Sequence, residues 1–147
     1  MQEKIEDLYR QTKEIASQNP ILKGSLAGHC AGISVEMLPE ATQILGNGTE
    51  PHVGWFEING RSFFKPPFIS LPKWLSKKSA RKYHCWLQNS SNIIDLTVIE
   101  TLRAMRDFDD SIIPEHIRYI GPQQLKEFNL TYHSIASGIE AINKYRR

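Results

Sequence analysis

Two short runs on either side of a polar turn constrain the fold of this chain more than any other feature. The runs Tyr83–Gln88 and Ile93–Thr97 are rich in apolar and aromatic residues, and the residues between them, at 89–92, are Asn-Ser-Ser-Asn. Polar turn residues between two such runs are typical of an antiparallel hairpin. We therefore predict that the two runs pair, with Gln88 opposite Ile93.

This register brings together two polar residues that stand in otherwise apolar strands. Trp86 then lies opposite Asp95, and His84 lies opposite Thr97, so His84 and Asp95 are diagonal neighbours on one face. Such diagonals are roughly 7–8 Å apart between backbones, within reach of long side chains. A lone buried carboxylate is costly, whereas a carboxylate beside an imidazole fixes its tautomer and supports its protonated form.

The N-terminal part of the chain has helical periodicity. Residues 3–17 form an amphipathic pattern, and a second helix is expected from about 28 to 45. Pro39 should kink or divide that second helix. A strand hairpin follows, with runs at 53–58 and 61–65 around Asn59-Gly60, a pair that strongly favours a tight turn.

The remaining segments complete the prediction of an α+β fold. Residues 66–82 contain three prolines and a basic cluster, and we expect a loop that acts as a flap near the site. The capping-box pattern of Thr97 and Glu100 predicts a helix over about 98–106. A short strand is expected at 117–120, and a C-terminal helix is marked by Tyr132, Ile135, Ile139 and Ile142. Together these elements predict a single domain over 1–147 in which an antiparallel sheet packs against helices.

Composition limits the partners and the compartment. The chain has 147 residues, with 18 basic and 16 acidic side chains and a small net charge of +2, which argues neither for nor against nucleic acid. We expect no nucleic-acid partner. The apolar runs are too short to span a membrane, and the polar N-terminus lacks a secretory signal. We expect a cytoplasmic protein, and export by a dedicated secretion system stays open. The basic cluster at 73–82 is read as a solvated loop, with a phosphate-rich or acidic partner as the minor alternative.

The two cysteines, Cys30 and Cys85, should be thiols in a reducing compartment. Cys85 follows His84 in the strand, so it should point to the opposite face and belong to the core. A zinc site formed by these two cysteines with His29 and His84 is an alternative, but the spacing fits no known ligand pattern. We expect no metal and no other cofactor.

Cys30 stands at the predicted start of a helix, directly after the small-residue segment 24–28. A helix N-terminus lowers the pKa of a thiol, and a neighbouring His lowers it further. The free N–H groups of the first turn could also stabilise an oxyanion. With Cys30 as nucleophile, His84 as base and Asp95 as orienting carboxylate, the three residues satisfy the general scheme of covalent catalysis.

Three motifs in this order carry a family resemblance: Gly28-His29-Cys30, the run 83–87 (Tyr-His-Cys-Trp-Leu), and the run 93–97 (Ile-Ile-Asp-Leu-Thr). Over residues 24–100 the chain resembles the transglutaminase-like branch of the papain-like cysteine protease superfamily. The resemblance implies Cys30 as nucleophile, His84 as base and acid, and Asp95 as the residue that orients the imidazole. Family members include peptidases, transglutaminases, amidases and deamidases.

The chain also departs from the family pattern. Cys30 and His84 are 84 − 30 = 54 residues apart, a longer gap than in compact members, and the loop at 66–82 is the expected insertion. No Gln precedes Cys30 at the spacing that papain-type peptidases use, so Ser25 or a backbone group is expected as the second oxyanion donor. His29 and Trp86 are further candidates for substrate contact.

Two functions of different class follow. The first is a cysteine hydrolase or acyltransferase that acts on an amide or peptide bond of a protein, a peptide or a small amide. The alternative is a catalytically inactive domain of the same fold that binds a protein partner. Interpreted without chemistry, Cys30 is a small buried residue at a helix start, His84 is a strand histidine satisfied by backbone groups, and Asp95 is a turn or cap residue. The reactivity of Cys30 separates the two.

Overall fold

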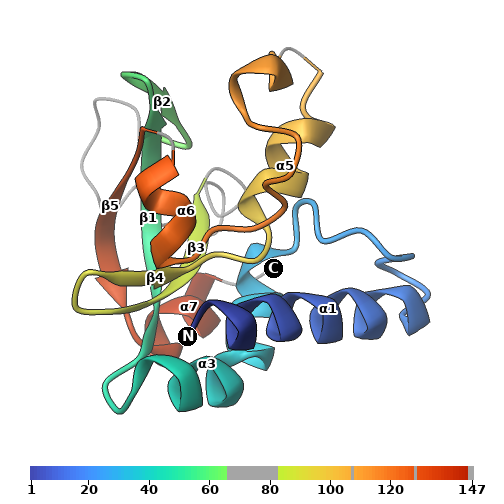
Figure 1. The fold of residues 1–147 in the computed structure, drawn as a ribbon. Coiled ribbons are helices and arrows are strands. Elements are labelled where there is room, and N and C mark those ends of the chain that lie inside the picture. The colour runs from blue at the N-terminus through green and yellow to red at the C-terminus, as the bar shows by residue number, and fades with distance from the viewer. Residues whose placement is uncertain (66–82, 107, 128, 146–147) are drawn as a thin grey trace.

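A computed structural model describes residues 1–65, 83–106, 108–127 and 129–145 (Figure 1). The predicted flap at 66–82 and its basic cluster lie outside the described residues.

Helices form where the sequence has helical periodicity. The first, α1, spans Gln2–Gln18, and the second predicted helix is divided into α2, Cys30–Glu36, and α3, Leu38–Leu45. The division falls at Met37, because Pro39 lies in the first turn of α3, where a missing N–H costs nothing. The other helices are α5 (Val98–Ala104), α6 (Pro122–Glu127), α7 (Ile139–Tyr145) and a 3₁₀ turn at Asp110–Ile112.

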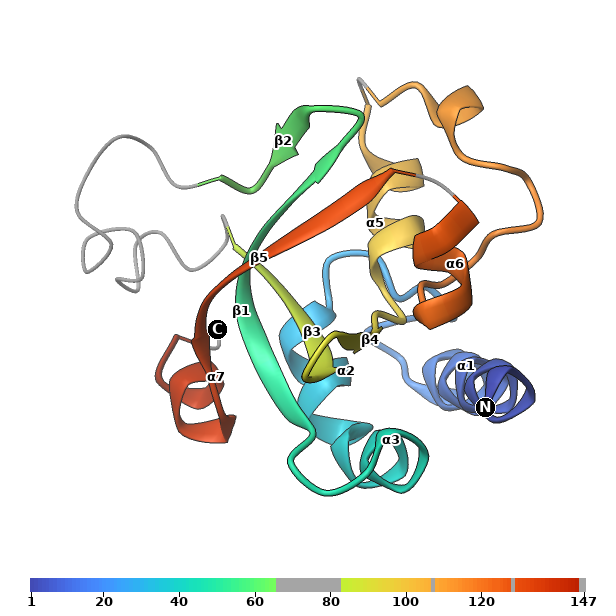
Figure 2. The same ribbon diagram turned by 60° about the vertical axis from the view of Figure 1, so that its left-hand side comes forward.

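The sheet is antiparallel and built around β1, Glu50–Ile58. Along one side of β1 lies β5, Leu130–Ser137. Along the other side lie β3, His84–Asn89, and then β2, Arg61–Phe63 (Figure 2). The fifth strand, β4 (Asn92–Ile94), pairs with the far side of β3. The predicted α+β architecture with an antiparallel sheet is confirmed.

Both predicted hairpins are present. Phe56 pairs with Phe63 in the first, and Gln88 pairs with Ile93 in the second, as the turn predicted. The second hairpin is shorter than expected, because β4 ends at Ile94 and the backbone of Asp95 bridges instead to Ile120. That single bridge is all that the structure forms of the strand predicted at 117–120.

The prediction of a C-terminal helix beginning near Tyr132 is wrong. This segment forms β5, and the helix α7 starts only at Ile139. The break lies at Gly138, whose φ of 99° is not helical and favours glycine. The apolar residues at 132, 135 and 139 have helical spacing, but the segment pairs with β1 through backbone hydrogen bonds instead. In this pairing Tyr132 lies opposite Phe56.

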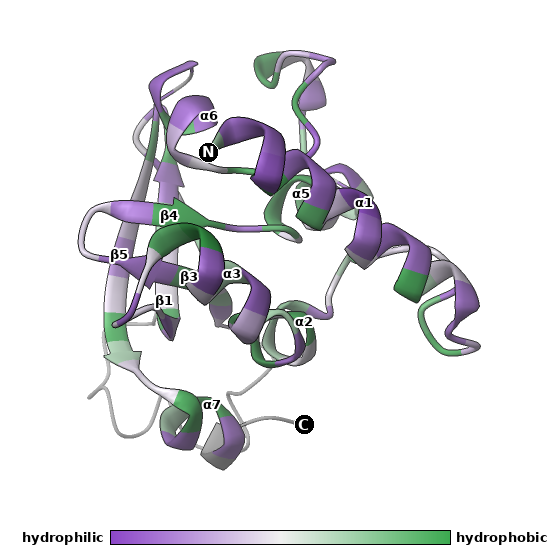
Figure 3. Ribbon diagram, turned by 60° about the horizontal axis from the view of Figure 1, so that its bottom comes forward, coloured by the Kyte–Doolittle hydropathy of each residue, from purple (hydrophilic) through white to green (hydrophobic). Residues whose placement is uncertain are grey.

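Helices cover both faces of the sheet. On one face Phe56 packs with α5 residues such as Ile99 and Leu102. On the opposite face Val53 and Cys85 pack with α2 and with Ile142 of α7. The end of the sheet near β4 packs on α1 and α3, and α1 carries hydrophilic and hydrophobic stretches along its length (Figure 3). Among the described residues, no helix has the length and hydrophobicity to cross a membrane.

Candidate active site

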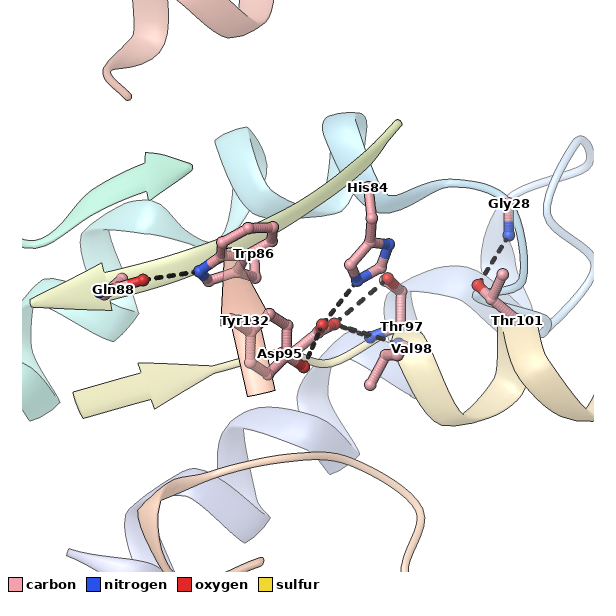
Figure 4. A network of polar contacts seen from close by, with 9 residues as sticks. All are labelled: Gly28, His84, Trp86, Gln88, Asp95, Thr97, Val98, Thr101 and Tyr132. Atoms are coloured by element: carbon pink, nitrogen blue, oxygen red, sulfur yellow. Dashed lines mark hydrogen bonds and ion pairs between the residues drawn. The ribbon is translucent and has the colours of Figure 1, made fainter. Parts of the chain in front are cut away.

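The second hairpin places an imidazole against a carboxylate. The Nε2 atom of His84 lies 2.6 Å from the Oδ2 atom of Asp95, and each side chain is 1% exposed (Figure 4). The turn that sets this register contains Ser90 with a φ of 54°. The predicted diagonal contact across the hairpin is therefore present in the structure.

The carboxylate of Asp95 is fully engaged by donors. Its Oδ1 atom accepts the backbone N–H groups of Thr97 at 3.2 Å and Val98 at 3.0 Å, at the start of α5. Its Oδ2 atom accepts from His84 and from the hydroxyl of Tyr132, at 2.7 Å. Asp95 thus holds the end of a strand, the start of a helix and the imidazole at once.

The predicted capping box at Thr97 is wrong, although the helix itself is present. The Thr97 side chain makes no capping hydrogen bond, because Asp95 already takes the first N–H groups. Glu100 instead accepts from the Tyr9 hydroxyl at 2.8 Å, from Lys13 Nζ at 2.8 Å and from the backbone N–H of Leu26 at 3.2 Å. The neighbouring Thr101 hydroxyl accepts from the N–H of Gly28 at 3.2 Å (Figure 4). The helix that follows Asp95 therefore anchors the loop that leads to Cys30.

Tyr132 is a site residue that the sequence analysis missed. Burial, the negative charge of Asp95 and the hydrogen bond to it raise the pKa of the Tyr132 phenol well above its usual range. The hydroxyl therefore stays protonated and donates to the carboxylate. It was missed because residue 132 was assigned to a helix. Gly138, which would lie inside that helix, was the available signal against it.

Cys30 is the first residue of α2 and is partly exposed. It packs against the buried cluster that contains Cys85, and hydrogen bonding to Cys85 and to His84 lowers the pKa of its thiol. Because Nε2 of His84 is bonded to Asp95, the other ring nitrogen, Nδ1, remains for Cys30. The three residues predicted to form a triad are therefore brought together, from a helix start, a strand and the segment after the next strand.

The electrostatics favour a charged pair at this site. The hydrogen bond from Cys85 is the largest effect that lowers the pKa of Cys30, and hydrogen bonding to His84 and its positive charge add to it, against burial. For His84, burial disfavours the cation, but the charge of Asp95 and the hydrogen bonds to Asp95 and Cys30 outweigh it and raise the pKa to about 10. Both shifts favour a thiolate beside an imidazolium.

Cys85 was predicted as a core residue that faces away from His84. It is buried, at 1% exposure, and packs with Val53 on the other sheet face, yet its thiol also contacts Cys30. This contact is possible because β4 pairs only with Leu87–Asn89, so α2 packs against β3 beside His84. Burial and then the hydrogen bond to Cys30 raise the pKa of Cys85, which therefore stays a thiol.

The three predicted substrate-contact residues lie in different surroundings. Trp86 is 1% exposed and its indole N–H donates to Gln88 at 2.8 Å, so its position does not support the predicted contact with substrate. Its ring stacks on that of His84, with centroids 6.1 Å apart, and thereby packs the imidazole in place. His29 is the residue before α2 and is partly buried. Ser25 is exposed, and its hydroxyl accepts from the N–H of Ala27 at 3.2 Å.

In the part of the chain that the structure describes, no group of three or more His, Cys, Asp and Glu side chains is placed to hold a metal ion. The arrangement of Cys30, His84 and Asp95 can perform thiol chemistry with its own groups: a nucleophile, an acid-base group and an orienting carboxylate. In comparisons with known proteins, no protein family, no curated protein and no solved structure matches this chain.

Proposed function

We propose that the protein is a cysteine-dependent hydrolase or acyltransferase that acts on an amide or peptide bond, with a transglutaminase-like core. The observation that carries this proposal is the 2.6 Å contact of His84 with Asp95, on a strand against which the helix that begins with Cys30 packs. The chain order of Cys, His and Asp, at a helix start, on a strand and after the next strand, supports the family assignment.

In the first half-reaction the Cys30 thiolate attacks the carbonyl carbon of the substrate. The negative charge moves to the carbonyl oxygen of a tetrahedral intermediate, close to the backbone N–H of Cys30 at the start of α2. Ser25 or a further backbone group supplies the second donor. The intermediate collapses when the Nδ1–H of His84 protonates the leaving amine, and a thioester to Cys30 remains.

In the second half-reaction His84 is a neutral base. It takes a proton from water, for hydrolysis, or from an amine or other acceptor, for acyl transfer. The deprotonated acceptor attacks the thioester, and the Cys30 thiolate leaves. Asp95 keeps the imidazole oriented throughout, because Oδ2 holds Nε2–H while Oδ1 is fixed to the backbone of α5.

An activated ester tests this function without knowledge of the natural substrate. We expect p-nitrophenyl acetate to release a burst of nitrophenol and to leave an acetyl group on Cys30, found by mass spectrometry of rapidly acidified samples. Cys30→Ala and His84→Ala should abolish the burst. His116→Ala is the matched control, because His116 is exposed and bonds only to Glu127 among the described contacts, at 3.0 Å.

The outcome also separates the two classes of function. Acetylation of Cys30 that needs His84 supports the enzyme. Equal, slow modification in wild type and His84→Ala would refute the proposal, and it would favour a domain that binds a protein partner without chemistry.

A further inference from the structure

The proposed reaction needs one thiol, but the site holds two. Cys85 lies on β3 directly after His84, is 1% exposed, and belongs to the buried cluster against which Cys30 packs. Two free thiols in one packed cluster, on elements that contact each other, are candidates for a disulfide.

The two thiols differ in the way that a redox pair requires. Cys30 is partly exposed at the start of α2, and hydrogen bonding to His84 helps to lower the pKa of its thiol. Cys85 is enclosed by Val53, Tyr83 and Ile142. Reactive cysteines that sense oxidants are accessible, have thiolate character and often stand next to a second cysteine that resolves the first oxidation product.

We propose that Cys30 and Cys85 form a reversible intramolecular disulfide in response to hydroperoxides, which blocks the nucleophile and protects it from irreversible oxidation. The inference goes beyond the proposed function and rests on two free thiols that pack in one cluster, not on any substrate.

The first step is oxidation of Cys30 by hydrogen peroxide. The thiolate sulfur attacks one peroxide oxygen, the O–O bond breaks, and the departing hydroxide takes a proton to become water. Sulfur gives up two electrons and becomes a sulfenic acid, while the peroxide is reduced by two electrons. The His84 imidazolium is the adjacent source of that proton, and Asp95 stabilises its charge.

The second step is resolution by Cys85. Its sulfur attacks the sulfur of the sulfenic acid, the S–O bond breaks, and the hydroxide that leaves combines with the proton released by the Cys85 thiol. One disulfide and two molecules of water result from two thiols and one peroxide. Burial holds Cys85 in the thiol form in the resting enzyme, so the second step becomes favourable only when Cys30 carries the leaving hydroxyl group.

The test treats the reduced protein with one equivalent of hydrogen peroxide, traps free thiols with N-ethylmaleimide and maps the peptides without reduction. In wild type we expect the peptide that contains Cys30 joined to the one that contains Cys85, within one monomer. Dithiothreitol should then restore alkylation of Cys30 by iodoacetamide. In His84→Ala, crosslinking should slow by roughly tenfold, because the cation that stabilises the thiolate is gone.

Cys85→Ser is the matched variant, because its hydroxyl keeps a donor near Cys30 but cannot form a disulfide. In this variant two equivalents of peroxide should convert Cys30 to sulfinic acid, because each of the two oxidation steps consumes one, and dithiothreitol does not reverse this product. The proposal is overturned if wild type also proceeds to sulfinic acid, or if the only disulfide joins two chains. These readouts are mass measurements, so a crosslink without acetylation by the ester would reject the proposed function and leave this inference standing.

Discussion

Replacement of Asp95 by Asn tests the charge arrangement of the site most directly. The substitution keeps the shape of the side chain, and one amide oxygen can still accept the N–H groups of Thr97 and Val98. The amide nitrogen then faces Nε2 of His84, where a donor now meets a donor. The imidazole is expected to respond by moving its proton to Nδ1, the nitrogen that should accept the proton of Cys30.

The loss of the carboxylate charge should change the ionisation of Cys30. Without Asp95 the burial of His84 favours the neutral ring, so the thiolate loses the neighbouring cation. The hydrogen bond from Cys85 still lowers the pKa of Cys30, whereas burial raises it. We therefore take the ordinary thiol pKa of about 8.5 for Cys30 in the variant. At pH 6 such a thiol is only about 0.3% ionised, roughly 300-fold less than a full thiolate.

The rate should fall by less than this population ratio. A more basic thiolate is intrinsically more nucleophilic, with a Brønsted coefficient of about 0.4–0.5, and this offsets most of the loss. We expect alkylation at pH 6 to slow by roughly tenfold overall. The pH profile is the sharper readout: wild-type Cys30 should react at a constant rate from about pH 6 to 8, whereas the variant should accelerate on the order of 100-fold over that range.

The assay is the rate of carbamidomethylation of Cys30 by iodoacetamide, followed by mass spectrometry at several pH values. Tyr132→Phe is the control, because it removes a hydrogen bond to the same carboxylate oxygen and leaves the charge of Asp95 in place. In Tyr132→Phe the alkylation rate of Cys30 should stay constant from about pH 6 to 8, as in wild type. A level profile in Asp95→Asn as well would refute the reasoning, because the thiolate would then not depend on the charged imidazole.

Three further predictions concern stability. Tyr132→Phe should lower the free energy of unfolding by about 1.5–3 kcal/mol in urea titrations, the usual value for a hydrogen bond to a charged group, and a change near zero would contradict its buried role. Gly54→Ala should lower the melting temperature sharply, because its Cβ would lie 2.0 Å from the carbonyl oxygen of His133; an unchanged melting temperature would argue against the β1–β5 register. The raised pKa of His84 stabilises the fold fully below pH 6.5, and this contribution is lost as pH rises through about 10. The lowered pKa of Cys30 stabilises the fold fully above pH 9.0, and this contribution is lost as pH falls. The two trends cancel between about pH 6.5 and 9, so the free energy of unfolding should be level there and decline on both sides by up to about 1.4 kcal/mol per pH unit; a steady slope across the level range would disprove the ion pair.

The parts of the site that depend on local sequence were predictable. The residues around Ser90 set the turn, the turn sets the register, and the register places His84 beside Asp95. Each step spans only a few residues, so a single sequence contains the information. The position of Cys30 at a helix start is likewise a local property, marked by the small residues before it and confirmed in the structure.

The parts that depend on distant pairing were not predictable. Tyr132 reaches Asp95 only because β5 pairs along β1, a pairing between segments that lie far apart in the chain. The contact between Cys30 and Cys85 depends on the short length of β4, which leaves room for α2 beside β3. Side-chain alternation correctly assigned Cys85 to the face opposite His84. It could not show that the start of α2 lies close to both residues.

The position of Asp95 has a consequence for how this protein could change over evolutionary time. Its carboxylate caps α5 and bonds to Tyr132, so the folded chain needs it whether or not any reaction takes place. Under the proposed function, a descendant without the reaction would be free to replace Cys30 but would still be selected to keep Asp95. Retention of this aspartate in a related sequence would therefore report a preserved architecture, and the state of the cysteine would report whether chemistry persists.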